Sequence, residues 1–563
     1  MKKVASRPYA ADAFENLKAA GIDPILARIY AARGILSASE LDSGLDALVP
    51  FDKLKNAVEM GGILADAIDE KKRILIVADY DSDGATACAV GMLALSEMGA
   101  IVDYLVPNRF EYGYGLTPEI VRLAKSREPD YIVTVDNGIA SVEGVMEANR
   151  LGIPVLVTDH HLPGDALPEA LCIVNPNQPG CPFPSKHLAG VGVMFYVMLA
   201  LRAELRNRGR RVPNLAALLD LVALGTVADV VRLDKNNRIL VSQGLKRIRD
   251  GRANPGVLAL FSVARRDARK ASSFDLGFML GPRLNAAGRM EDMALGIDCL
   301  IGRDFAKALE AAQRLDDLNR ERKSVESIMQ EDALAILESC ENPPGYSISL
   351  FDPNWHQGII GILASRIKEK FHRPSFAFAR GGEGEIKGSG RSITGFHIRD
   401  ALDLVAKHHP GLILKFGGHA AAAGLTIREE NFELFGRAFE ETASSLLSES
   451  DLERLFETDG MLDEEQMTLD LAKKIEAMSW GQGFPEPGFE GFFSVEQQRI
   501  VGEKHLKLKL RYADKVFDAM LFFHPDPLPD RIRAIYSLSV NDYNGSTSLQ
   551  LVIRQCIPEL PSA

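Results

Sequence analysis

The chain has 563 residues, of which 46% are hydrophobic and 25% charged, and its formal net charge is −12 at pH 7. The length predicts about three or four domains, and the acidic balance excludes a protein that coats nucleic acid with its whole surface, although a local basic groove is compatible with it. The six cysteines form no CxxC pair, and no segment has the length of a membrane span or the apolar core of a signal peptide. We therefore expect a cytoplasmic protein with no membrane partner.

The first part of the chain is polar and has helical spacing, which predicts an N-terminal helical extension over residues 1–55. From Arg73 to about Ala228, short apolar β-rich runs alternate with helical stretches. This alternation predicts a parallel sheet with helices on both faces, which we assign to a catalytic domain over residues 56–240.

Three carboxylates follow the first of these strands, in the stretch ILIVADYDSDGATAC. An extended backbone would place Asp79, Asp81 and Asp83 on one face. Gly84 is expected to allow a tight turn before a helix over Ala85–Met98. Like charges held together need cations to neutralise them, which predicts a metal site. An Asp-rich turn with a helix cap is the alternative interpretation.

Two further strands end in the same way, in YIVTVDNG with Asp136 and in IPVLVTDHHLP with Asp159, His160 and His161. Because the carboxyl ends of parallel strands meet at one edge of a sheet, these side chains are expected to gather there. Asp229 is a fourth acidic strand-end candidate, although it follows a helix-like run and an Asp there also caps turns. Oxygen ligands with one or two imidazoles favour Mn²⁺ or Mg²⁺, and no thiolate stands at the three strand ends to favour zinc.

A helical connector is expected next, over residues 241–342. The segment Ala306–Glu338 has helical spacing without Gly or Pro, which predicts one long helix. Pro343 and Pro344 are expected to end it.

Two further domains follow the connector. A strand at Tyr346–Phe351 begins a second α/β unit, assigned to residues 343–450, and short alternating strands such as His505–Tyr512 predict a small OB-like barrel over residues 451–563. The expected fold class is therefore α/β, with two α/β lobes joined by a long helix, the site in the cleft between them, and a C-terminal OB-like β-barrel.

The acidic blocks DYDSDG, VDNG, TDHH and TVAD, in this order, resemble the motifs of the DHH phosphoesterase superfamily. The resemblance continues through VPNRFEYGYGL, LGPRLNAAGRM, NWHQGIIGILASRIKEKFHRP, GSGRSI and KFGGHAAAAG. This set is similar to the superfamily's bacterial exonucleases that degrade single-stranded DNA from the 5′ end. It implies a DHH domain, a DHH-associated domain, two Mn²⁺ or Mg²⁺ ions, 5′-mononucleotide products, and roles in DNA repair and recombination.

The same resemblance implies the roles of the acidic and histidine residues. The metal ligands would be Asp81, Asp83, Asp136, His160 and Asp229. Asp136 would bridge the two ions, and His161 would face the scissile phosphate as an electrostatic stabiliser or proton donor. Many members of the superfamily carry a His where this chain has Val77, so Asp79 or a water is expected to replace that ligand.

Substrate contacts are implied at nine further positions, namely Arg109, Arg289, Trp355, His356, Arg391, Ser392, Gly417, Gly418 and His419. The arginines would bind phosphate oxygens, and Arg391 with Ser392 would hold the 5′-terminal phosphate. Trp355 would stack a base and His356 would touch phosphate, with a structural anchor as the alternative. The amides of the glycine-rich run would bind phosphate as a nest or a helix N-terminus, with close helix packing as the alternative.

Two other functions stay open. One is a phosphodiesterase for short oligonucleotides or cyclic dinucleotides, and the other is a catalytically silent DHH scaffold that binds single strands. The barrel favours a polymer substrate, which it would bind through a basic groove and the aromatic residues Tyr512, Phe517, Phe522 and Phe523. The expected partners are single-stranded DNA, a single-strand-binding protein and a helicase, with the chain itself a monomer.

Overall fold

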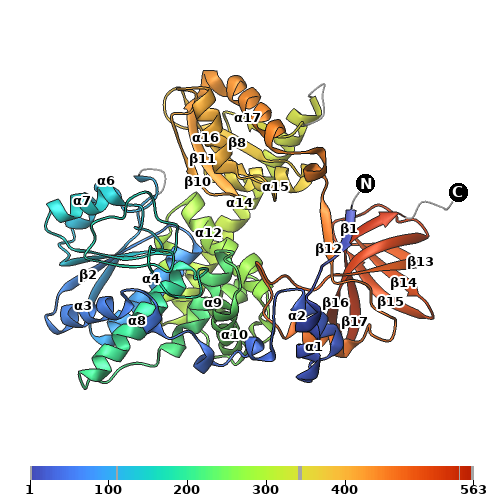
Figure 1. The fold of residues 1–563 in the computed structure, drawn as a ribbon, viewed down its shortest axis with the longest axis horizontal. Coiled ribbons are helices and arrows are strands. Elements are labelled where there is room, and N and C mark those ends of the chain that lie inside the picture. The colour runs from blue at the N-terminus through green and yellow to red at the C-terminus, as the bar shows by residue number, and fades with distance from the viewer. Residues whose placement is uncertain (1–2, 109–111, 340–344, 544, 559–563) are drawn as a thin grey trace. The chain divides into compact units, whose positions relative to one another are not determined.

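The computed structural model describes residues 3–108, 112–339, 345–543 and 545–558 (Figure 1). The chain divides into two compact units. The larger unit comprises Ser6–Asp316 and Glu457–Ala563, and the smaller comprises Met1–Ala5 and Asp317–Phe456. Among the described residues, no helix combines the length and the apolar character needed to cross a bilayer.

A five-stranded parallel sheet, in the order β3-β2-β4-β5-β6, forms one core of the larger unit. Its strands are β2 (Arg73–Ala78), β3 (Ile101–Leu105), β4 (Tyr131–Val135), β5 (Val155–Thr158) and β6 (Cys172–Val174). In β2 every residue after Arg73 is buried, as is typical of a strand covered on both faces. Helices lie on both sides of this sheet (Figure 1), and the predicted α/β lobe is confirmed.

Twelve α-helices of the larger unit precede the long connector helix in the described residues. They are α1 (Ala11–Ala19), α2 (Pro24–Ala31), α3 (Ala57–Asp69), α4 (Ser82–Met98), α6 (Pro118–Lys125), α7 (Val142–Arg150), α8 (Gly190–Asn207), α9 (Leu219–Ala228), α10 (Lys235–Arg249), α11 (Pro255–Val263), α12 (Gly281–Met290) and α13 (Ala294–Ile301). A π-helical turn, η6 (Asp275–Leu280), leads directly into α12. The predicted long helix is α14 (Phe305–Ser339), and Pro343 and Pro344 lie outside the described residues.

The smaller unit is built on a mixed sheet in the order β10-β11-β9-β8-β7, in which only the pair β7 and β8 is parallel among the described strands. Its elements are β7 (Ile348–Phe351), α15 (Ile360–Phe371), β8 (Ser375–Arg380), β9 (Glu385–Arg391), α16 (Ile398–His408), β10 (Lys415–Gly418), β11 (Ala422–Arg428) and α17 (Phe432–Leu446). Phe376 packs edge-on against Phe435 and Phe439 in its core. The predicted second α/β lobe is confirmed.

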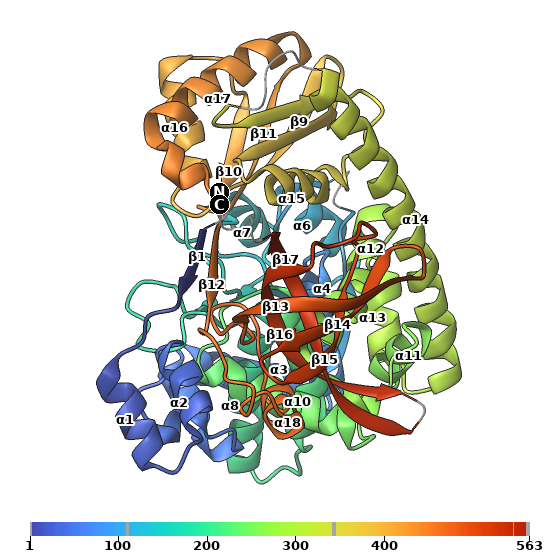
Figure 2. The ribbon, with the colours of Figure 1, turned by 90° about the vertical axis from the view of Figure 1, so that its right-hand side faces the viewer.

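The last five strands close into a barrel in the order β13-β14-β15-β17-β16 (Figure 2). They are β13 (Phe489–Val501), β14 (His505–Tyr512), β15 (Lys515–Leu521), β16 (Arg531–Tyr543) and β17 (Ser546–Pro558), preceded by α18 (Leu469–Glu476). The parallel contact of β15 with β17 closes the barrel, which is the topology of an OB-fold. The predicted OB-like barrel is confirmed. One pairing was not predicted, between β1 (Lys3–Ser6) and β12 (Leu455–Thr458).

Candidate active site

The first acidic motif folds differently from the sequence expectation. Helix α4 begins at Ser82, because Asp81 is its N-cap and accepts hydrogen bonds from the amides of Asp83 and Gly84. Asp83 is therefore in the first helical turn, and the predicted extended run with a turn at Gly84 is wrong. Gly84 serves close packing instead, since a Cβ there would lie 2.5 Å from the carbonyl oxygen of Asp79.

Asp136 follows β4 in a left-handed conformation, with φ 62°. Such a conformation costs a non-glycine residue on the order of 1–3 kcal/mol and persists only where surrounding contacts impose it. Here the side-chain amide of Asn137 donates through Nδ2 to the carbonyls of Val77 and Val135 and fixes the turn. A Cβ at Gly190, the first residue of α8, would lie 2.7 Å from the Asp136 carboxylate. The backbone thus holds this carboxylate in one orientation.

The DHH triplet follows β5, and its Asp159 orients the two histidines. Oδ1 of Asp159 accepts from the amides of His160 and His161 and lies 2.8 Å from Nδ1 of His161. Its Oδ2 accepts from the Ile139 amide at 2.9 Å. Sequence reasoning gave Asp159 no role, although its place at the strand end was a signal.

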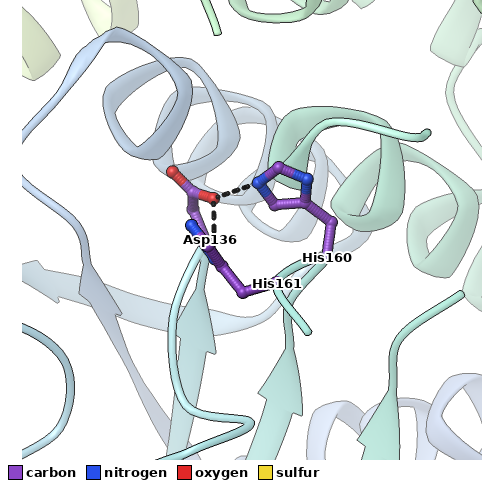
Figure 3. Close-up of side chains that lie close together, drawn as sticks. All are labelled: Asp136, His160 and His161. Atoms are coloured by element: carbon purple, nitrogen blue, oxygen red, sulfur yellow. Dashed lines mark ion pairs between the residues drawn. The ribbon is translucent and has the colours of Figure 1, made fainter. Parts of the chain in front are cut away.

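The predicted ligands converge, as Figure 3 shows for Asp136 and the two histidines. Nε2 of His160 lies 3.1 Å from Oδ1 of Asp136, 3.5 Å from Oδ2 of Asp229 and 3.8 Å from Oδ2 of Asp83. The candidate ligand atoms form three overlapping groups within 4.8 Å, namely Asp83–His160–Asp229, Asp79–Asp81–Asp136 and Asp136–His160–His161. The structure therefore brings all six predicted ligands together, and Asp136 belongs to two of the groups.

Asp229 reaches this cluster from the C-cap of helix α9, so its prediction as a strand-end residue is wrong. Most of α9 is buried, and Gly225 lets it approach the first motif, since a Cβ there would lie 3.0 Å from Oδ1 of Asp83. The next residue, Val230, has φ 61°, which is rare for a β-branched residue. The cluster is thus assembled from three strand ends and one helix end.

Burial and mutual repulsion make the charged form of this cluster unfavourable. Burial, and next the charge of Asp81, raise the pKa of Asp83 to about 7. Burial, and next the charge of Asp83, raise the pKa values of Asp136 and Asp229 well above the usual range. Burial, helped by His161, lowers the pKa of His160 to about 4, so this imidazole is neutral at pH 7.

The residues present fit divalent cations. Oδ1 of Asp136 and Nε2 of His160 are buried, face each other at 3.1 Å, and find no hydrogen-bond partner among the described residues. A neutral imidazole lone pair that faces a carboxylate oxygen is unfavourable unless a cation lies between or beside them. Carboxylates with an imidazole are the donor set that suits Mn²⁺ or Mg²⁺.

His161 has a different environment from His160. Burial is the largest single influence and acts to lower the pKa of His161, but the hydrogen bond to Asp159 and the charges of Asp159, Asp79 and Asp81 together raise this pKa to about 9. The Tyr114 hydroxyl lies 3.2 Å from Nδ1 of His161 and donates to the carbonyl of Asp136. Sequence reasoning missed Tyr114. The two glycines that flank it were the available signal of a special backbone position, and in the structure both adopt φ 76°.

In the smaller unit, β9 and β11 place the GSGRSI and GGHAAAAG motifs side by side, with Arg391 opposite Ala422. Nη1 of Arg391 donates to the Gly390 carbonyl at 2.8 Å and lies 3.4 Å from the Ser389 hydroxyl, and no carboxylate within the described ranges forms an ion pair with it. The Ser392 hydroxyl instead donates to the Phe396 carbonyl at 2.6 Å. The hydroxyl beside the guanidinium is therefore that of Ser389, which sequence reasoning missed, whereas the Ser392 hydroxyl is engaged by backbone carbonyls.

The N-terminal turn of α15 lies beside this arginine. A Cβ at Gly361 would lie 2.9 Å from Oγ of Ser389 and 3.0 Å from Nη2 of Arg391. The amides of Ile360 and Ile362 donate to the carbonyls of His356 and Ile359, so the candidate anion donors here are the Gly361 amide, the Ser389 hydroxyl and the Arg391 guanidinium.

Gly417 and Gly418 belong to β10, and His419 lies in the hairpin turn to β11, where its amide donates to the Ala422 carbonyl. The predicted helix N-terminus is therefore wrong, and so is the alternative of helix packing, because the small residues are paired strands. The prediction that these amides bind phosphate as a nest stays a prediction.

The remaining predicted contacts have separate outcomes. Trp355 is 4% exposed, which favours the structural-anchor alternative. Nδ1 of His356 accepts from the Gly358 amide in the turn before α15. Arg289 lies in the last turn of α12, and the preceding glycine packs against the carbonyl of Tyr80, beside the first acidic motif. Arg109 lies outside the described residues.

Comparison with protein families first defines a class. Residues 73–226 match the DHH family N-terminal domain, and residues 344–445 match the DHHA1 domain. The chain is thus a DHH phosphoesterase with its associated domain. Residues 458–555 match the RecJ OB domain.

Full-length relatives then give the family. The single-stranded-DNA-specific exonuclease RecJ of Escherichia coli (strain K12) is 50% identical over 558 residues, which cover 96% of each chain. RecJ of Thermus thermophilus is 32% identical over 98% of this chain and 77% of its own length. A crystal structure of Thermus thermophilus RecJ in complex with Mn²⁺ matches with a TM-score of 0.84 and 30% identity over 100% of this chain and 80% of that chain. This chain belongs to the RecJ family, and the resemblance inferred from its motifs is confirmed.

Proposed function

We propose that this chain is a metal-dependent exonuclease that hydrolyses single-stranded DNA from its 5′ end to 5′-mononucleotides, in DNA repair and recombination. The observation that carries the proposal is the buried cluster around Asp136. In it a carboxylate oxygen and the neutral nitrogen of His160 face each other, and no described residue gives either of them a hydrogen bond. Membership of the RecJ family, whose Thermus thermophilus member has been crystallised with Mn²⁺ and with Mg²⁺, supports it.

Two divalent ions would be held by this cluster, one by Asp83, His160 and Asp229 and the other by Asp79 and Asp81, and Asp136 would be a ligand available to both. When bound, such ions activate water and stabilise the leaving oxygen. The chain's own residues do the rest. Asp159 keeps His161 protonated and oriented, so that it donates to an oxygen of the scissile phosphate as an electrostatic stabiliser or proton donor.

We assign the 5′-phosphate to Arg391, Ser389 and the first turn of α15, with Ser392 supporting the loop beside them. Burial lowers the pKa of the Arg391 guanidinium, and an anionic ligand would compensate that cost. We keep Arg109, Arg289 and the backbone of Gly417, Gly418 and His419 as contacts to the DNA backbone. His356 is kept as a phosphate contact, whereas Trp355 is retained only as an anchor.

Further proposals concern organisation and partners. We propose a monomeric cytoplasmic enzyme, divided as 1–55, 56–240, 241–342, 343–450 and 451–563, that works with a single-strand-binding protein and a helicase. In the barrel, Phe517 is only 8% exposed and belongs to the core, whereas Phe522 and Phe523 are exposed and stay candidates for stacking on DNA. The location of the site in a cleft between the two lobes stays a prediction.

The direct test is degradation of one long oligonucleotide, labelled at either end, single-stranded or paired, with Mn²⁺ or Mg²⁺. Metal-dependent release of mononucleotides from the 5′ end of the single strand alone is expected. Attack confined to very short oligomers would replace the proposal by a small-substrate phosphodiesterase. Binding without cleavage would replace it by a scaffold.

Replacing Tyr114 with Phe is expected to lower kcat about tenfold with no change in thermal stability. The substitution removes the hydroxyl that positions His161 and the Asp136 turn, and loss of such supporting contacts costs about 10- to 100-fold in activity. Tyr9→Phe, at an exposed tyrosine, is the matched control and should leave kcat unchanged. A Tyr114→Phe enzyme with full activity would remove this residue from the mechanism.

Replacing Arg391 with Met is expected to raise KM for a 5′-phosphorylated strand about 10- to 100-fold, because a hydrogen bond to a charged group contributes about 1.5–3 kcal/mol. The preference over a 5′-hydroxyl strand should disappear, while kcat changes little. Arg380→Met is the control, since that arginine is exposed and pairs with Glu429. If the variant still prefers the 5′-phosphate, the assignment of this pocket is wrong.

A further inference from the structure

Two phenylalanines are left at the surface around the π-helical turn η6. Phe274 is 52% exposed and Phe278 is 68% exposed, whereas Leu276 and Leu280 between and after them are fully buried. The two rings stack on each other, with centroids 5.0 Å apart and planes inclined by 25°. Burial of apolar surface contributes about 25 cal/mol of stabilising free energy per Å², and the exposed part of these rings lacks this contribution. A paired aromatic surface of this kind therefore indicates a site that binds a flat apolar ligand.

This aromatic pair lies beside the end of α9, which carries Asp229. A Cβ at Gly277 would lie 3.2 Å from Cγ1 of Val227, so η6 packs along the last turn of α9, next to α12. Phe278 follows Gly277 directly. Val230, the residue after Asp229, is 63% exposed, so the surface here is open to solvent. The aromatic pair therefore lies on the element that packs against the last turn of the helix carrying Asp229.

A basic segment, RRDARK, is held against the same turn. Asp275, within η6, is buried and accepts from Nε of Arg266 at 2.6 Å, which ties the segment to the aromatic pair. Arg269 is engaged by Asp267. Arg265 is exposed, and it forms no ion pair with any carboxylate in the described part of the chain. Lys270 is paired with Asp542, so the exposed cation of this segment is Arg265, one residue before the arginine that is bound to η6.

We propose that Phe274 and Phe278 form a base-stacking platform for single-stranded DNA beside the metal cluster, with Arg265 on the backbone of the same strand. The proposal rests on the proposed function and deepens it. Bases stack on aromatic faces with little regard to sequence, and a guanidinium suits the phosphates between them. Bases within a duplex are stacked on one another and do not offer their faces, so the platform also selects single strands.

The test is abasic scanning of binding, with metal chelated by EDTA so that the strand is not cut. A series of fluorescent 5′-phosphorylated oligonucleotides, each with one abasic position, is titrated with wild type and with the Phe274→Ala/Phe278→Ala variant. In wild type, one or two adjacent abasic positions should weaken binding about 5- to 100-fold. In the variant the intact strand should bind more weakly by a similar factor, and those positions should no longer matter.

Two controls separate stacking from structure. Phe305→Ala removes a phenylalanine of comparable exposure, 47%, from the same unit and should keep the wild-type profile. Phe278→Trp should keep the wild-type abasic profile, whereas Phe278→Leu, which keeps an apolar side chain without a ring, should lose it. If the double alanine variant fails to fold, the comparison of these two single variants tests stacking in its place. Arg265→Gln should lower the slope of log K against log salt concentration by about one, which is the loss of one phosphate contact. The abasic positions that weaken binding should stay the same.

Identical abasic profiles in wild type and variant would overturn the platform. A change in oligomeric mass with unchanged DNA binding would assign the rings to a protein contact and overturn it as well. If wild type neither binds nor degrades single strands, the proposed function itself fails. If it degrades them and its abasic profile is flat, only the platform fails.

Discussion

Replacing Asp136 with Asn is expected to abolish nuclease activity, by about 10⁴-fold or more, while making the metal-free protein more stable. The activity is lost because Asp136 is the carboxylate common to two ligand groups, and residues that act as one unit show losses of this size. The stability gain follows because burial and the neighbouring carboxylates raise the pKa of Asp136, which means that its charge opposes folding.

Thermal unfolding measures the second effect. In EDTA the variant should unfold at a higher temperature than wild type, by about 1 °C for each kcal/mol of relieved repulsion, because the entropy of unfolding grows with the size of the unit. Added Mn²⁺ should stabilise wild type strongly and the variant weakly, since only tight binding to the folded state shifts the transition. Asp103→Asn is the control, because that carboxylate is exposed and pairs with Arg127. A variant that is inactive but less stable in EDTA would contradict the electrostatic account.

Replacing Gly190 with Ala is expected to reduce activity about 100-fold without removing any ligand. A methyl group here would lie 2.7 Å from the Asp136 carboxylate, so either that carboxylate or helix α8 must move. The same residue donates its amide to Oδ2 of Asp83 at 2.6 Å, and the Val191 amide donates to Oδ1 at 2.9 Å. A displacement of about 1 Å at a reacting centre costs about 100-fold.

The measurements for this variant are kcat and the affinity for Mn²⁺ by titration calorimetry, both of which should fall. Gly62→Ala is the matched control, because that glycine lies within helix α3 with open space around its Cα. Alanine there should leave activity unchanged and stabilise slightly, as it does in helix interiors. If Gly190→Ala retains full activity and metal affinity, the cluster tolerates displacement and is less rigid than its packing indicates.

The metal cluster could be predicted from the sequence because parallel strands impose its geometry. Once an apolar run predicts a buried strand, the residue after it must stand at the carboxyl edge, and this placed Asp136 and His160 correctly. The long helix and the barrel followed in the same way from periodicity and strand spacing. These features depend on local pattern alone.

The features that were missed depend on contacts between distant segments. The helix start at Ser82 required knowing that the Asp81 side chain caps it. Tyr114 meets His161 only in the folded chain. Gly361 lets helix α15 approach Ser389 and Arg391, which only the folded chain reveals. The hairpin at Gly418 was predicted as a helix terminus because small residues suit both structures. None of these has a periodicity of its own.

Because Asp229 lies at the end of helix α9, a chain that is still being synthesised cannot form the complete metal cluster. The ligands are spread from residue 79 to residue 229, so the cluster is incomplete until α9 has left the ribosome. Domains generally fold as units as they emerge, and long-range contacts form late. A nascent or prematurely terminated chain that stops before α9 therefore lacks one ligand, and the cell is not exposed to unfinished nuclease.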